Sequence, residues 1–193
     1  MNDQIEKSVE VLNQGGIVIF PTDTAFGIGC RIDNEKAIER LFKIRKRPLN
    51  QATPVLFDTI ERIKEYVLPL DKNIEKLMHQ YWPGALTVIV KCKKNKVPDL
   101  VRGGGENLGV RIPDHRVPIA LIKKTGVPIL GPSANIHGEL TPYMFNEIDK
   151  KLIRLADFVL EGKTKQNNLA STVVDCSKTP WKILRLGALN INI

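Results

Sequence analysis

The sequence has few cysteine and histidine residues, and neither type is spaced to bind a metal ion. Its three cysteines, Cys30, Cys92 and Cys176, are odd in number and widely separated, which argues against a disulfide framework and against a CxxC metal motif. The three histidines show no HExxH pattern or other zinc-ligand spacing. We therefore expect ordinary semi-buried thiols and no metal site built from protein ligands.

Long apolar runs are also missing. No stretch approaches the roughly 20 apolar residues that a membrane-spanning helix needs. Asp3, Glu6 and Glu10 interrupt the first 13 residues, so this segment lacks the apolar core of a secretory signal peptide. The content of 42% hydrophobic and 26% charged residues is typical of a soluble globular protein. We expect a cytoplasmic protein that does not associate with a membrane.

The charge balance is positive, with 29 Lys and Arg against 21 Asp and Glu and a formal net charge of +8. Such a surface attracts polyanions such as nucleotides and RNA, although many basic proteins use their charge only for solubility. The chain of 193 residues is long enough to bury a substantial core. We expect a single domain over residues 1–193.

Hydrophobic periodicity predicts alternating helices and strands without a composition break. A helix that begins after the predicted N-cap Asn34 ends in a basic cluster before Pro48. The other helices are expected over 4–13, 58–66, 71–81, 116–124 and beyond 145, and strands over 17–20, 53–57, 85–92, 108–112, 127–130, 157–160, 171–176 and 182–186. This order predicts an α/β fold with a twisted mixed sheet flanked by helices.

Two glycine-containing segments resemble phosphate-binding loops, but each lacks a required glycine. For "EGKT", which ends at Thr164, the P-loop pattern needs glycine where Asp157 stands. For "RGGGENLG", the GxGxxG pattern needs glycine where Leu108 stands, so we interpret this segment as a flexible turn. A nucleotide would therefore be bound by neither standard loop.

Four other segments join a strand or helix end to a polar turn: "FPTDTAFGIG", "RKRP", "LGVRIP" and "PSAN". Each has a purely structural interpretation when taken alone: an Asx or ST turn at residues 22–24, a helix C-terminus at 45–47, a surface charge at Arg111, and caps at Ser133 and Asn135. Taken together, they indicate a ligand site, because open α/β sheets commonly bind ligands at strand ends.

These motifs match a known family. The chain closely resembles the YrdC-type threonylcarbamoyl-AMP synthases in their short, single-domain form. The resemblance runs from Gly15 to Leu189 through seven ordered motifs: "FPTDTAFGIGC", "KIRKRP", "YWPGALTVIV", "LGVRIPDH", "GPSAN", "STVVD" and "ILRLGAL". It implies a YrdC-like fold, a twisted α/β sheet with a large basic concave face.

The resemblance also implies an activity. Family members carboxylate L-threonine with bicarbonate, and the carbamate attacks the α-phosphate of ATP to give threonylcarbamoyl-AMP and pyrophosphate. A separate transferase complex then uses the product to modify adenosine next to the anticodon of certain tRNAs. No protein nucleophile is needed, so the expected site contains arginine, hydroxyl and amide groups without a catalytic His or Cys. Mg²⁺ is expected to accompany ATP, held mainly by the nucleotide.

The family's functional residues carry over by motif. The catalytic set implied by the resemblance is Arg45, Arg47, Ser133 and Asn135. The L-threonine contacts implied are Thr24, Arg111, Gly131 and Ser171, with Gly131 approaching the ligand through its backbone. The nucleotide contacts implied are Arg47, Gln51, Asn107, Ser133, Thr141 and Arg185.

Some positions depart from the family pattern. Arg45 stands where a lysine is expected, and Gln51 stands where Lys or Asn is common. Leu56 replaces a polar residue of some members, and Asn107 replaces a frequent threonine. His137 is interpreted as a surface residue.

Two other functions remain open from the sequence alone. The charge excess and Lys91, Lys93, Lys94 and Lys96 are consistent with a module that binds double-stranded RNA or tRNA without catalysis. The same fold also occurs in hydrogenase-maturation carbamoyltransferases. Those chains are longer and carry acylphosphatase and zinc-finger-like segments that are not visible here.

Overall fold

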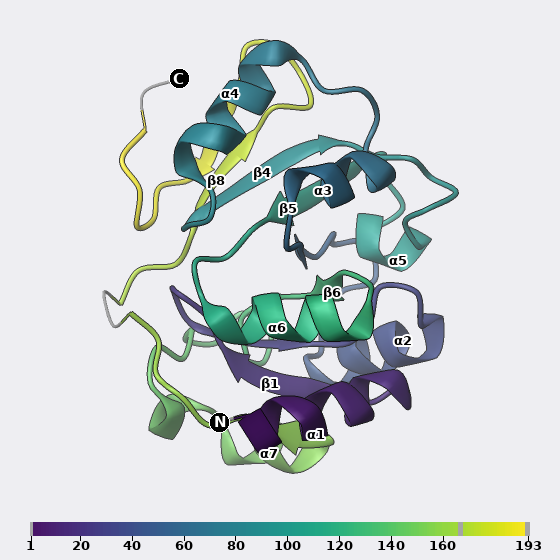
Figure 1. Ribbon diagram of the computed structural model, residues 1–193, viewed down its shortest axis with the longest axis vertical. Coiled ribbons are helices and arrows are strands. Elements are labelled where there is room, and N and C mark those ends of the chain that lie inside the picture. The colour runs from purple at the N-terminus through teal and green to yellow at the C-terminus, as the bar shows by residue number, and fades with distance from the viewer. Residues whose placement is uncertain (1, 166–167, 192–193) are drawn as a thin grey trace.

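The computed structural model describes residues 2–165 and 168–191 (Figure 1). The helices of this part are α1 (Asn2–Asn13), α2 (Glu35–Ile44), α3 (Ile60–Tyr66), α4 (Lys72–Tyr81), α5 (Asp99–Arg102), α6 (Arg116–Thr125), α7 (Lys150–Leu155) and the 3-10 turn η1 (Phe145–Glu147). The strands are β1 (Val18–Pro21), β2 (Phe26–Gly29), β3 (Val55–Leu56), β4 (Leu86–Lys91), β5 (Asn107–Arg111), β6 (Ile129–Leu130), β7 (Phe158–Val159), β8 (Thr172–Asp175) and β9 (Lys182–Arg185).

The strands form two mixed sheets. The larger has the order β6-β3-β5-β4-β8-β9, in which β3 runs parallel to β5 and β4 parallel to β8, while the other neighbours are antiparallel. The smaller has the order β2-β1-β7. In Figure 1, β4, β5 and β8 lie in the upper half with α3 and α4, whereas β1, α1 and α7 lie in the lower half. The expected mixed α/β architecture is confirmed, but it is divided between two sheets.

Backbone hydrogen bonds join the two sheets edge to edge. The N–H of Ile28 in β2 donates to Pro132 O at 3.0 Å, and the N–H groups of Leu130 and Ala134 donate to Cys30 O at 2.9 Å and Phe26 O at 2.8 Å. This ladder lies between β2 and the segment that contains β6. It fixes the position of "PTDT", which precedes β2, relative to "GPSAN", which follows β6.

The core has two parts. One packs α1 and α6 through Val9, Leu12 and Leu121 against Phe20 of β1. The other, larger part includes Phe26, Phe42 and Phe57 and fills the rest of the interior. In α1, α2, α4 and α6 the apolar residues recur at helical spacing, and the face that they form is buried. Within the residues that the structure describes, no helix is both long and apolar enough to cross a membrane.

The differences from the sequence prediction are local. Strand β2 was not predicted, because its short apolar segment is interrupted by Gly27 and Gly29 and directly follows the polar residues 22–24. Helix α5, only 4 residues long, was also missed. Asn34 is the N-cap of α2 as predicted, with its side chain accepting a hydrogen bond from the N–H of Ala37. The three cysteines are free, as expected, and buried rather than semi-buried.

Gly29 provides a test of the junction between the sheets. A Cβ added at Gly29 would overlap the carbonyl oxygen of Leu130, which is backbone and cannot move aside. We expect Gly29→Ala to lower the free energy of unfolding by about 3 kcal/mol and the melting temperature by roughly 6 to 12 °C. Thermal unfolding followed by circular dichroism measures both.

Gly109→Ala is the matched control in a strand. Its Cβ would meet nothing closer than the Thr87 side chain at 3.6 Å, an ordinary contact. A loss above about 1 kcal/mol there would point to a general intolerance of alanine in these strands. Equal stability of Gly29→Ala and the unaltered protein would contradict the tight junction.

Candidate functional site

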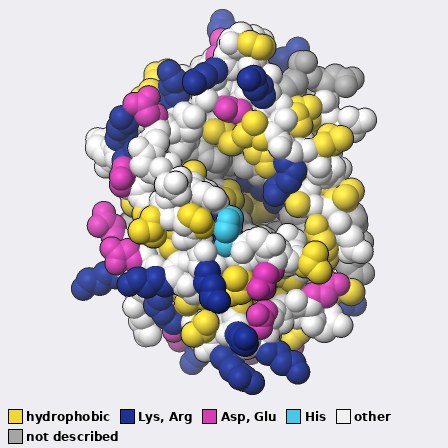
Figure 2. Space-filling view, turned by 180° about the vertical axis from the view of Figure 1, so that it is seen from behind, with side chains coloured by type: hydrophobic (Ala, Val, Ile, Leu, Met, Phe, Trp, Pro, Cys, Tyr) yellow, Lys and Arg dark blue, Asp and Glu magenta, His cyan; other side chains and the backbone are white. Residues whose placement is uncertain are grey.

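A cavity of about 560 Å³ lies between the two sheets. Figure 2 shows a hollow in the middle of one face of the molecule, with apolar and basic side chains around its opening. The floor is one face of the larger sheet, since alternate residues of three strands line it. These residues are Asn107, Gly109 and Arg111 of β5, Thr87 and Ile89 of β4, and Val173 and Asp175 of β8.

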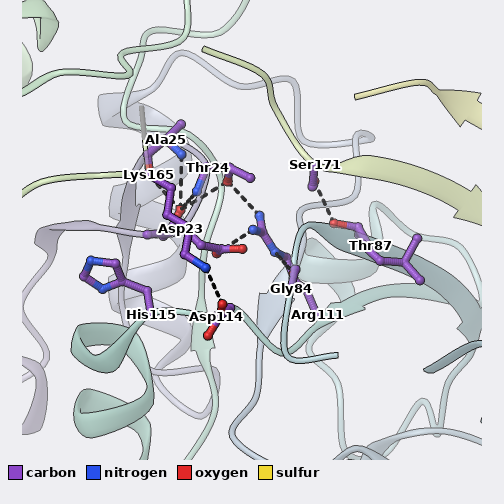
Figure 3. Close-up of polar contacts among 12 residues, drawn as sticks. Asp23, Thr24, Ala25, Gly84, Thr87, Arg111, Asp114, His115, Lys165 and Ser171 are labelled. Atoms are coloured by element: carbon purple, nitrogen blue, oxygen red, sulfur yellow. Dashed lines mark hydrogen bonds and ion pairs between the residues drawn. The ribbon is translucent and has the colours of Figure 1, made fainter. Parts of the chain in front are cut away.

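Arg111 lies on this floor and is almost fully buried. Its Nη2 donates to Asp23 Oδ1 at 2.6 Å, its Nη1 donates to Thr24 Oγ1 at 2.9 Å, and its Nε donates to Gly84 O at 3.0 Å. Figure 3 shows the guanidinium between Asp23 and Thr24 on one side and Gly84 on the other. Burial lowers the pKa of Arg111, and the charge of Asp23 acts in the opposite direction. The interpretation of Arg111 as a surface charge is therefore wrong.

The predicted turn at residues 22–24 is present, and it also builds the site. Thr22 Oγ1 donates to Ala25 O at 2.7 Å and accepts from the N–H of Thr24 at 3.2 Å. This turn directs Asp23 and Thr24 toward Arg111. Thr22 and Thr24 line the cavity, whereas Asp23 does not. Sequence reasoning gave Asp23 no role beyond the turn. Its position between Thr22 and Thr24, directly after a strand, was the one signal that could have marked it as a site residue.

Ser171 links two further side chains at the same end of the cavity. Its hydroxyl lies 2.9 Å from Thr87 Oγ1, and it accepts from Nη2 of Arg185 at 3.0 Å. Nε of Arg185 donates to the backbone oxygen of Ser171 at 2.9 Å. Burial and then the charge of Arg111 lower the pKa of Arg185. Thr87 was not predicted as a site residue, and it is buried on the floor beside Ser171.

The C-terminal cap of α2 brings two more arginines to the cavity. Lys46 has a φ of +50°, and the N–H of Arg47 donates back to Phe42 O at 2.9 Å, as in a Schellman motif. This reversal leaves both Arg45 and Arg47 among the lining residues. Arg45 and Arg47 therefore belong both to the end of helix α2 and to the cavity lining.

Arg45 is 3% exposed and is held from behind by Asn135. Its Nε and Nη2 donate to the backbone oxygen and Oδ1 of Asn135 at 3.1 and 3.2 Å, while its buried Nη1 has no partner among the described residues. Burial, followed by the charge of Arg47, lowers the pKa of Arg45 to about 10. An anion in the cavity would offset the cost of burying these two cations.

Ser133 and Asn135 form a hydrogen-bonded unit. Ser133 Oγ donates to Asn135 Oδ1 at 2.6 Å, and Asn135 Nδ2 donates to Glu139 O at 2.7 Å. Ser133 lines the cavity, whereas Asn135 stands behind Ser133 and Arg45. Asn135, predicted in the catalytic set, is therefore placed as a positioning residue for Ser133 and Arg45. Thr141 also lines the cavity, next to Pro142, whose carbonyl accepts from the N–H of Phe26 at 2.9 Å.

Two predicted contacts are placed differently from expectation. Gln51 is exposed and does not line the cavity, and only its backbone oxygen takes part, accepting from Arg47 Nε at 3.1 Å. Gly131 lines the cavity, but its N–H donates to Pro54 O at 3.0 Å. The space left by its missing Cβ is filled by Leu56, since a Cβ there would overlap the Leu56 side chain. Close packing against Leu56 is thus one structural reason for glycine here, and the backbone approach to a ligand stays a prediction.

Other segments were missed or misjudged. The interpretation of "RGGGENLG" as only a flexible turn is incomplete, because Gly105, Glu106 and Asn107 of this segment line the cavity. The amide of Asn107 donates to Ser177 Oγ at 3.1 Å. His137 is half-buried rather than a surface residue, and its Nδ1 lies 3.5 Å from Nη1 of Arg47.

The electrostatic character of the cavity follows from its lining. It contains five arginines and two carboxylates: Arg45, Arg47, Arg102, Arg111 and Arg185 with Glu106 and Asp175. Such an excess of cations, of which Arg45 and Arg111 are buried, favours an anionic ligand. In residues 2–165 and 168–191, no group of three or more His, Cys, Asp or Glu side chains could hold a metal ion.

Comparisons with known proteins find relatives that match nearly the whole chain. The chain is 30% identical to the threonylcarbamoyl-AMP synthase of Vibrio parahaemolyticus, over 96% of this chain and 100% of that protein. It is also 30% identical to the threonylcarbamoyl-AMP synthase of Bacillus subtilis, over 96% of this chain. In that case the chain spans only about half of the relative, 54% of its length.

Solved structures show the same relationship. The Pyrococcus abyssi Sua5 structure in complex with L-threonine superposes with a TM-score of 0.91 at 28% identity, covering 96% of this chain and 54% of that one. Escherichia coli YciO superposes with a TM-score of 0.88 at 26% identity, covering 98% and 92%.

The model of the Sua5/YciO/YrdC family, described as "Telomere recombination", matches residues 10–187. This match spans nearly the whole chain, and its ends enclose the four polar turns that build the cavity. The chain therefore belongs to the Sua5/YciO/YrdC family.

Proposed function

We propose that the protein is a threonylcarbamoyl-AMP synthase, a nucleotidyltransferase that acts on L-threonine, bicarbonate and ATP. The observation that carries the proposal is the single cavity shared by the Asp23-supported Arg111 and by Arg45 and Arg47. It offers one buried site for a carboxylate and others for phosphate groups. Its volume of about 560 Å³ lies in the range of small-molecule sites.

The proposed reaction forms two bonds. The amine of L-threonine attacks the carbon of bicarbonate, and loss of water leaves an N-carboxylate. An oxygen of this carbamate attacks the α-phosphorus of ATP, and the bond to the β-phosphate oxygen breaks. The products are threonylcarbamoyl-AMP, pyrophosphate and water, with no change of oxidation state.

The threonine end of the site is proposed around Arg111. Its guanidinium binds the substrate carboxylate, with Thr24 and Ser171 as hydroxyl contacts. Asp23 holds the guanidinium in one orientation from behind and is therefore a positioning residue. The complex of the Pyrococcus abyssi relative with L-threonine supports this assignment.

The nucleotide end is proposed around Arg45 and Arg47, with Ser133 beside them. These groups bind the phosphates and stabilise the charge that develops when pyrophosphate leaves. Arg185, Thr141 and Asn107 are proposed as further nucleotide contacts that line the same cavity. Gln51 remains a prediction that its exposed position does not support.

Catalysis in this proposal depends on position and charge. Cys30, Cys92 and Cys176 are buried outside the cavity lining, so no thiol is placed as a nucleophile. Mg²⁺ would arrive with ATP and be held by its phosphates, since the described residues provide no carboxylate cluster for it. Holding the carbamate in line with the leaving group then supplies most of the rate enhancement.

The product is proposed to serve the threonylcarbamoyl modification of tRNA, through a separate transferase complex in the cytoplasm. The RNA-binding module without catalysis is less well supported by the contacts. Lys94 pairs with Glu106 at 2.7 Å, and Lys93 donates to Lys64 O at 2.9 Å, so part of the lysine cluster is already engaged. Direct tRNA contact remains a prediction.

The proposed function predicts strict dependence on three substrates. Pyrophosphate release from ATP should require both L-threonine and bicarbonate, and mass spectrometry should detect threonylcarbamoyl-AMP. Omission of any one substrate should reduce release to background. Release that does not depend on threonine would contradict the proposal, and salt-sensitive RNA binding without release would favour the RNA-binding module.

Two matched arginine substitutions should affect different substrates. Arg111→Lys keeps a cation beside Asp23 but loses the planar donors, so the KM for threonine should rise by about 10- to 100-fold. Arg47→Lys should instead raise the KM for ATP by a similar factor of about 10 to 100. Steady-state kinetics with each substrate varied measures both. The same substrate being affected in both variants would contradict the two-ended site.

Ser133→Ala tests the hydroxyl beside the arginines. The substitution removes the hydrogen bond that orients Asn135 Oδ1 beside Arg45, and this should reduce kcat by about 10- to 100-fold while the fold remains intact. Ser8→Ala is the control, because Ser8 is buried in α1 and donates to Gln4 O at 2.7 Å, outside the cavity lining. Unchanged activity in Ser133→Ala would show that the site lies on another loop.

A further inference from the structure

We propose that Leu56 makes the subsite for the amino-acid side chain apolar. The protein then selects its amino acid by β-branched shape and not by the hydroxyl group, and it accepts L-valine together with L-threonine. This inference rests on the proposed function and specifies its substrate range.

Leu56 lies next to the proposed carboxylate site. It is the last residue of β3, and its Cα partner in β5 is Arg111. Both residues line the cavity, and neighbouring strands lie about 4.8 Å apart. An amino acid whose carboxylate binds Arg111 therefore has its side chain within reach of Leu56.

The shape of Leu56 is fixed by its surroundings. The residue is 2% exposed and belongs to the core part that contains Phe20 and Ile129. On its other side it fills the space above Gly131, where the nearest atoms to an added Cβ are its Cγ, Cδ1 and Cδ2. Gly131 contributes no side chain to the cavity lining, so at this point the lining side chain is the isobutyl group of Leu56.

The hydroxyl groups around this end are oriented by hydrogen bonds within the protein. Thr22 donates to Ala25 O, and Ser133 donates to Asn135. Thr24 accepts from Arg111, and the Ser171 hydroxyl lies between Thr87 and Arg185. Leu56 is the alkyl group beside Arg111 that a substrate methyl group would contact.

An apolar wall distinguishes amino acids by the methyl groups of their side chains and only weakly by a hydroxyl group. One methyl group more or less in such a site changes kcat/KM by about 10- to 200-fold. A hydrophobic site cannot strongly reject an isostere that differs by a hydroxyl group. Serine lacks the methyl group of threonine, whereas valine keeps the β-branched shape and replaces the hydroxyl with methyl.

The test measures pyrophosphate release with L-threonine, L-valine and L-serine, each with ATP and bicarbonate, and identifies the products by mass spectrometry. For the unaltered protein, we expect kcat/KM for valine within about tenfold of that for threonine, and for serine about 10- to 200-fold lower. Leu56→Ala should reduce the preference for threonine over serine to less than about tenfold. Leu56→Met, which keeps an apolar wall of similar volume, should retain it.

Ile89→Ala is the matched control. Ile89 lines the same cavity from β4, where its Cα partner is Gly109 rather than Arg111. Ile89→Ala should leave the ratio of kcat/KM for threonine to kcat/KM for serine within about threefold of the value for the unaltered protein, because it removes no contact beside Arg111.

The outcomes separate the two levels of the proposal. Release with threonine but a valine rate more than about 100-fold lower would overturn the inference and leave the proposed function standing. An unchanged threonine-to-serine ratio in folded Leu56→Ala would do the same. No release with any of the three amino acids would overturn both. If Leu56→Ala does not fold, the valine-to-threonine ratio of the unaltered protein decides.

Discussion

The buried ion pair between Asp23 and Arg111 is the interaction on which the rest of the site depends. Its two side chains are 3% and 8% exposed, and it joins the turn before β2 in one sheet to the end of β5 in the other. Removing one partner of such a pair generally costs about 3 to 5 kcal/mol, because the remaining charge stays buried. The pair therefore fixes the relative position of the two sheets and the orientation of the guanidinium at once.

The other arginines extend the same principle. Arg45 and Arg185 are held by hydrogen bonds to Asn135 and Ser171, and no carboxylate pairs with either in the described contacts. Burial lowers the pKa of each, so the charged form is maintained at a cost. Anionic substrates would recover that cost on binding. A protein that stores unfavourable charge in this way needs a rigid frame, which the hydrogen-bonded junction of β2 with β6 provides.

Much of this arrangement could be predicted from the sequence, and the failures have physical causes. Apolar spacing located the helices, and polar residues at strand ends located most of the cavity lining. Alternation within "LGVRIP" showed that Arg111 points away from its apolar neighbours, but not whether that face is covered. Strand β2 pairs through backbone groups of a glycine-rich segment, which leaves little side-chain signal. Gln51 shows the reverse case: its motif position predicts a nucleotide contact, but its side chain is exposed outside the cavity lining, because motif position does not determine side-chain direction in a loop.

Gly131 and Leu56 show most clearly what a single sequence conceals. The two residues are far apart in the chain, yet they share one volume, because the leucine fills the space that the glycine leaves. Neither residue alone indicates a subsite, and a motif comparison treats them separately, Leu56 as a departure and Gly131 as a match. The charged groups proposed to hold the reactants are tied to the backbone and to one another, so they resist change. The wall proposed to contact the amino-acid side chain consists of one replaceable alkyl group. Selectivity in this fold can therefore change while the anion-binding arginines stay in place.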